Sequence, residues 1–213
     1  MKAFRWIPML ALLGLIVPMA CDDAVGPMDG PAQVRILLTD APTDYLASAD
    51  VCISRVYLVP GEDREDGEGD GNGPNWVDLF NDSAEPLCYN LLELRDGITA
   101  DLTDAREVDP GEYGQLRLVV SSAEVTLADP YEFNNGDVTR PLFIPSGMQT
   151  GIKVLLNESI EAEDGTLTTL IVDFDVNENF VLQGNPDTPA GIHGILFTPV
   201  LKEKGRSQGA PEN

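Results

Sequence analysis

Short apolar segments, separated by glycine, proline, asparagine and aspartate, recur along this sequence and constrain its fold more than any other feature. Runs such as VRILL (34–38) and IKVLL (152–156) end at turn-forming residues. A long run (111–127) indicates one long strand that can bend at Ser121 and Ser122. No useful length of chain repeats its apolar residues with the 3.6-residue period of a helix. We therefore expect an all-β fold with little helix: an antiparallel β-sandwich, Greek-key or similar.

Turn chemistry supports this fold class. The segments EDGT (163–166) and NNGD (134–137) place Asp-Gly and Asn-Gly between apolar runs, a pattern that favours hairpins. Helical turns are expected only within residues 97–106 and 42–49. The sequence thus predicts strands joined by tight turns along nearly the whole folded body.

The N-terminal residues are typical of an exported protein. Lys2 and Arg5 precede an uncharged apolar run (6–20) that is too short to cross a bilayer as a helix. Cys21 follows Ala20, as in the signal of bacterial lipoproteins, where the cysteine carries the lipid. An ordinary signal peptide with an incidental cysteine is the alternative, because Pro18 stands where lipoprotein signals prefer leucine.

These features predict the organisation of the chain. We expect a lipoprotein signal peptide (1–20), a flexible tether (21–32), one β-sandwich domain (33–204) and a disordered tail (205–213). The mature protein would be exported and lipid-anchored to a bacterial membrane, where it would face the periplasm or the cell surface. The membrane, reached through the lipid, is therefore the first expected partner.

The charge of the chain limits its other partners. Its net charge is −23, with 36 acidic and 13 basic residues. Such a surface repels nucleic acid, which needs lysine and arginine to displace its counterions, so no nucleic-acid partner is expected. Solubility explains the charge most simply, and attraction of cations is the alternative.

Two cysteines remain in the predicted domain. Cys52 and Cys88 form an even pair in an exported protein, which favours a disulfide over two buried thiols. The bridge would enclose an acidic, glycine-rich segment (61–75). That segment lacks the glutamate that a calcium-binding EF-hand loop needs at its twelfth position, so it is expected to be a solvated loop.

Several motifs occur in an order that resembles a known family. The most specific are TDAP (39–42), NLLELRDG (90–97) and PSGMQTGIK (145–153), with GEYGQLRLVV (111–120) between them. Together they resemble the bacterial and archaeal domain of unknown function (DUF) 4382. The resemblance implies an exported, often lipid-modified β-domain. It supplies no catalytic residues, because the family has no established activity.

Acidic residues give the main candidate site. If IVDFDVNE (171–178) is a strand, Asp173 and Asp175 share one face, and Asp40 after the first strand can join them. Carboxylate oxygens of this kind can hold Ca²⁺, the one cofactor that the residue pattern suggests. The simpler alternative is that these side chains face water.

The sequence therefore leads to three functional hypotheses. The first is an anchored, non-catalytic domain for envelope structure or binding, whose molecular activity is not specified. The second is a calcium-dependent module that binds carbohydrate or protein. The third is a hydrolase in which Asp173 and Asp175 act as paired carboxylates.

Overall fold

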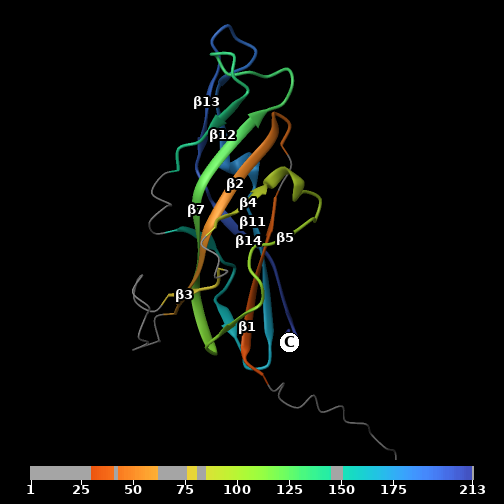
Figure 1. The fold of residues 1–213 in the computed structure, drawn as a ribbon, viewed down its shortest axis with the longest axis vertical. Coiled ribbons are helices and arrows are strands. Elements are labelled where there is room, and N and C mark those ends of the chain that lie inside the picture. The colour runs from red at the N-terminus through yellow and green to blue at the C-terminus, as the bar shows by residue number, and fades with distance from the viewer. Residues whose placement is uncertain (1–29, 41–42, 62–75, 81–84, 145–150, 213) are drawn as a thin grey trace, which may run out of the picture.

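The computed structural model describes residues 30–40, 43–61, 76–80, 85–144 and 151–212 (Figure 1). The strands are β1 (Ala32–Thr39), β2 (Leu46–Pro60), β3 (Val77–Asp78), β4 (Leu87–Asn90), β5 (Ala100–Asp101), β6 (Arg106–Val108), β7 (Gly111–Leu127), β8 (Thr139–Pro141), β9 (Ile152–Leu155), β10 (Ile160–Ala162), β11 (Leu167–Asp173), β12 (Phe180–Asn185), β13 (Gly191–Phe197) and β14 (Leu201–Gly209). The helical turns are η1 (Leu91–Glu93) and α2 (Val176–Asn179). The predicted signal peptide, Cys21 and most of the acidic segment lie outside the described residues.

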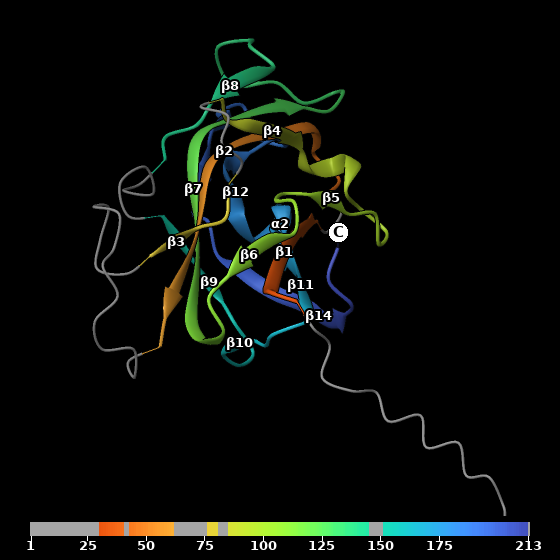
Figure 2. The ribbon, with the colours of Figure 1, turned by 60° about the horizontal axis from the view of Figure 1, so that its bottom comes forward.

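Twelve of the described strands form one sheet, and β12 and β13 form a separate hairpin. The main order is β3-β2-β7-β9-β14-β11-β1-β5. Most neighbours are antiparallel, but β1 is parallel to β11 and β9 is parallel to β14. The all-β expectation is confirmed. The sheet is mixed and curls around its own core, as Figure 2 shows, so an antiparallel sandwich is not what the chain adopts.

The curl follows from irregularities in the two longest strands. The pairing of β2 with β7 shifts register at four places, including between Cys52 and Ile53. A β-bulge bends a strand and increases its twist. On β7 the extra residue is Ser121, whose hydroxyl donates to the carbonyl oxygen of Cys52 at 3.1 Å. The predicted bend at the two serines is therefore confirmed.

Each bulge also changes which residues face the core. On β2 the fully buried side chains are Ala49, Val51 and Ile53 before the irregularity, and Val56 and Leu58 after it. Side chains alternate strictly along a regular strand, so this change from odd to even positions needs an extra residue on β2, which is Ser54 between Ile53 and Arg55. Both halves of the long strand can thus bury aliphatic side chains inside one curled sheet.

The helical turns lie at other positions than the sequence predicted. Residues 97–106 contain β5 and the start of β6 rather than a helical turn, and β2 begins inside the other candidate segment. The helical turns instead follow Asn90 and Asp175, whose side chains accept hydrogen bonds from the backbone at the helix start. No helix in the described part of the chain is long and apolar enough to cross a bilayer.

The C-terminal segment is also more ordered than predicted. β14 extends to Gly209, and its residues from Gly205 to Gly209 pair with β11. The strand therefore runs past the expected boundary at residue 204, and the expected disordered tail (205–213) does not begin before residue 210. Ladder hydrogen bonds come from the backbone, so a polar sequence such as KEKGRSQG can form a strand wherever a neighbouring strand is available.

At one of the two predicted hairpins, the strands on either side of the turn do not pair with each other. At NNGD, Gly136 donates its N–H to the Phe133 carbonyl at 2.8 Å, which closes the expected turn. At EDGT, Thr166 N–H donates to the Glu163 carbonyl at 3.1 Å. There, however, β10 pairs with β7 rather than with the following β11. The turn was predictable, whereas the partner of β10 was not.

Candidate functional site

The predicted acidic site is divided between different structural elements. β11 ends at Asp173, and Asp175 has a left-handed backbone (φ 35°) as the N-cap of α2. The alternation that would place the two carboxylates on one strand face therefore stops at Asp173. The expectation that both residues lie on one strand is therefore wrong.

Asp40 has a structural contact. It is only 2% exposed, and its Oδ1 accepts the Val176 backbone N–H at 2.8 Å. Phe174 N–H, in turn, donates to the Thr39 carbonyl at 3.0 Å. These bonds attach the end of β1 to the turn that follows β11, which explains an aspartate in the TDAP motif.

The other two carboxylates also have local partners. Asp173 Oδ2 pairs with Lys204 Nζ at 3.3 Å, and Asp175 Oδ1 accepts the Glu178 N–H at 3.3 Å. Lys202 pairs with Glu178. This hydrogen bond and the nearby negative charges of Glu178, Asp175 and Asp173 raise the pKa of Lys202. Nowhere among the described residues do three or more His, Cys, Asp or Glu side chains meet in a metal-binding arrangement.

Replacing Asp40 distinguishes a structural role from a metal-binding one. We expect Asp40→Ala to lower the free energy of unfolding by about 1–3 kcal/mol, because it leaves the buried Val176 N–H without this acceptor. Urea unfolding in EDTA and in calcium should give the same loss. Asp173→Asn, which changes a partly exposed carboxylate, is the matched control and should have little effect. A loss seen only in calcium would restore the metal interpretation.

The cysteine pair forms a disulfide between neighbouring strands. Cys52 on β2 and Cys88 on β4 lie directly opposite each other in register, with their Cα atoms 4.0 Å apart. β4 is followed at once by η1, whose Leu91 and Leu92 are buried in the core. The bridge therefore attaches this core segment to the long strand β2.

The single histidine lies in the separate β12–β13 hairpin. His193 is an exposed residue on β13, and its Nδ1 lies 3.2 Å from Nδ2 of Asn134. Its backbone oxygen accepts a hydrogen bond from Arg140 at 2.7 Å. A histidine beside an amide has no nucleophile to activate, so this arrangement does not favour covalent catalysis.

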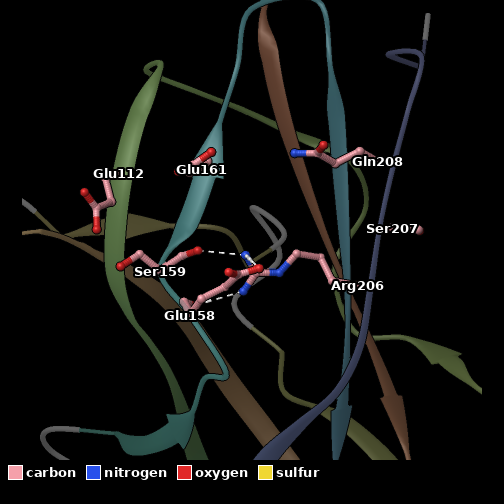
Figure 3. Close-up of a pocket in the computed structure, with 7 residues that line it drawn as sticks. All are labelled: Glu112, Glu158, Ser159, Glu161, Arg206, Ser207 and Gln208. Atoms are coloured by element: carbon pink, nitrogen blue, oxygen red, sulfur yellow. Dashed lines mark hydrogen bonds and ion pairs between the residues drawn. The ribbon is translucent and has the colours of Figure 1, made fainter.

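A polar cavity of about 530 Å³ lies where β7, β10 and β14 approach one another (Figure 3). It is lined by Glu112, Glu158, Ser159, Glu161, Arg206, Ser207 and Gln208. These residues come from three distant segments of the chain. No local sequence motif joins them, so the amino-acid order gave no signal for this cavity.

Arg206 is fixed in place by several acceptors. Its guanidinium makes two 3.0 Å hydrogen bonds with Glu203, whose side chain is 3% exposed. It also donates to the backbone carbonyls of Ser159 at 2.7 Å and Glu158 at 2.9 Å. Glu203 accepts the Asn157 N–H as well, at 3.0 Å. With its donors used in this way, Arg206 holds the cavity wall together rather than reaching towards a ligand.

The carboxylates give the cavity its chemical character. Glu112 and Glu161 occupy directly opposite positions on β7 and β10. Like charges in such cross-strand positions repel, and no ion pair joins either one to a residue in the described parts of the chain. The cavity can therefore accept hydrogen bonds from hydroxyl or ammonium groups.

The fold and the site together define a curled, disulfide-linked β-domain with a polar cavity between β7, β10 and β14. The family described as "Domain of unknown function (DUF4382)" matches residues 31–189, which is more than half of the chain. The protein belongs to that family. No curated protein and no solved structure matches it.

Proposed function

We propose that this protein is exported, anchored to a bacterial membrane by a lipid on Cys21, and acts outside the cytoplasm as a non-catalytic domain for binding or envelope structure. One observation carries the proposal: both ends of the folded body lie at the same pole. Gly30 lies against Pro211, and Gln33 exchanges two hydrogen bonds with the backbone of Glu212, at 3.0 and 2.8 Å.

The β12–β13 hairpin lies at the opposite pole, as Figure 1 shows. An anchor upstream of Gly30 would therefore hold the domain by one end. The hairpin would point away from the membrane, where it can meet other molecules. This geometry suits a domain displayed at a membrane surface.

The chemistry of the described residues supports a non-catalytic role. Asp40, Asp173 and Asp175 take part in separate structural contacts rather than forming a carboxylate pair. A paired-carboxylate hydrolase needs two such groups on either side of one substrate bond. At these three residues the geometry therefore favours a structural role over hydrolysis.

Metabolic labelling with palmitate tests the anchor. In a bacterial host that modifies lipoproteins, we expect the label to enter the wild-type protein and to be absent from Cys21→Ala. The wild type should sediment with membranes, and the variant should not. Equal labelling of both proteins, or none in the wild type, would show that Cys21 is not lipid-modified.

A further inference from the structure

The edge of β14 that faces the polar cavity has no neighbouring strand in the described part of the chain. β14 pairs with β11 from Lys202 to Gly209, but on its other side it pairs with β9 only at Leu201 and Lys202. Beyond that point the chain diverges from β14, and β10 pairs with β7 instead. Residues 205–209 are therefore left with one edge that has no ladder, which we call the open edge.

Side chains rather than a strand fill part of the gap between β10 and β14 (Figure 3). Arg206 donates to two backbone carbonyls just before β10, and Thr168 donates to the carbonyl oxygen of Glu161 at 3.3 Å. These acceptors on the β10 side are thus already occupied. On the other wall Gln208 is exposed, and a Cβ built on Gly209 would lie in open space. The room for an added strand therefore lies beside β14.

The charge of the cavity selects the kind of strand that fits. Glu112 and Glu161 lie opposite each other, and the whole chain has a net charge of −23. A strand that carries lysine or arginine would relieve the repulsion between the two glutamates. The segment of this chain that precedes Gly30 does not fit, because residues 22–29 contain three aspartates and no basic residue. A second copy of so acidic a chain is repelled as well.

We propose that the open edge binds a lysine- or arginine-rich segment of a partner protein, which adds to β14 as a further strand. Its backbone continues the ladder of the sheet, and its basic side chains pair with Glu112 and Glu161. Glu161 is exposed while its neighbours Ile160 and Ala162 are buried, so the basic residues belong at alternate positions on the outer face. The inference deepens the proposed binding role and rests on it.

Fluorescence anisotropy of a labelled peptide tests the charge of the site, with the full-length chain kept in a non-ionic detergent. The probe alternates lysine and valine over about eight residues, a usual strand length. We expect saturable binding that weakens with added salt, and none for a glutamate–valine peptide. Glu112→Gln/Glu161→Gln should weaken binding about fivefold at low salt. The matched control Glu124→Gln/Glu132→Gln changes two exposed glutamates elsewhere and should leave the affinity unchanged.

The backbone pairing is tested separately. Methylation of alternate amide nitrogens removes the hydrogen-bond donors from one edge of the probe. Of the two alternating patterns, at least one should weaken binding about tenfold or more, because a strand added to a sheet is held by its main chain. Hydrogen exchange at residues 205–209 should become slower when the unmodified probe is added, and exchange in the β12–β13 hairpin should not change.

Several results would overturn the proposal. They are no binding of the lysine–valine probe, unchanged affinity in Glu112→Gln/Glu161→Gln, or full affinity of both methylated probes. Equally tight binding of spermine would also do so, because spermine carries the charges without a peptide backbone. Slower exchange only outside residues 205–209 would exclude the open edge as the site. None of these results depends on a lipid at Cys21, so palmitate labelling can fail while this proposal stands, and the reverse is also true.

Discussion

Arg206→Ala is expected to lower the free energy of unfolding by about 3–5 kcal/mol, because it leaves the carboxylate of Glu203 buried without its cation. Glu203 is 3% exposed and receives both 3.0 Å hydrogen bonds from Arg206. Glu203→Ala should cost a similar amount, because it removes the partner of a guanidinium that is 16% exposed. Urea unfolding at pH 7 measures both losses.

Two further variants make this prediction specific. The double variant Arg206→Met/Glu203→Leu should recover part of the loss, because it removes both buried charges at once. Glu178→Gln breaks the ion pair between Glu178 and Lys202. Both of these side chains are about half exposed, so this variant should change the free energy of unfolding little. If Arg206→Ala destabilises the protein no more than Glu178→Gln does, the Arg206–Glu203 pair does not hold the cavity wall.

The second large effect is expected at the disulfide. Cys52 and Cys88 are 36 residues apart in sequence. For a closed loop of this length, the chain-entropy relation gives a stabilisation of about 4 kcal/mol relative to the open chain. Cys52→Ser/Cys88→Ser should therefore lower the free energy of unfolding by nearly this amount, and hydrogen exchange at β4 and η1 should become faster.

Reduction supplies the matched control. A reducing agent should lower the stability of the wild type to that of the double variant, and it should not change the double variant. Alkylation of both thiols in the unreduced protein, followed by mass spectrometry, would contradict the prediction because it would show that the bridge is absent.

The sequence predicted the local features of this fold well. Turn residues marked the ends of most strands, and the serine pair marked the bulge in β7. Turns and strand alternation depend on neighbouring residues, so they can be recognised in the sequence. The cysteine pair and the family were also predicted, because both depend on residue identity alone.

The candidate site was predicted less well. Asp40, Asp173 and Asp175 were recognised as unusual, and the structure gives Asp40 and Asp175 roles in connecting or capping elements. The prediction failed after Asp173, where β11 ends and the chain leaves the strand. The alternation of polar and apolar residues continues in the sequence through Asp175. It therefore does not show that the strand has ended before Asp175, which adopts a left-handed conformation.

Local strand segments, turns and the cysteine pair can thus be assigned from the amino-acid order, because short-range geometry and residue chemistry decide them. Tertiary structure alone decided that β1 pairs in parallel with β11, that polar β14 is a strand, and that Glu112, Glu161 and Arg206 line one cavity. The physical reason is that backbone ladder hydrogen bonds are the same for every residue except proline. Which strands pair therefore depends on how the whole sheet curls to bury its core.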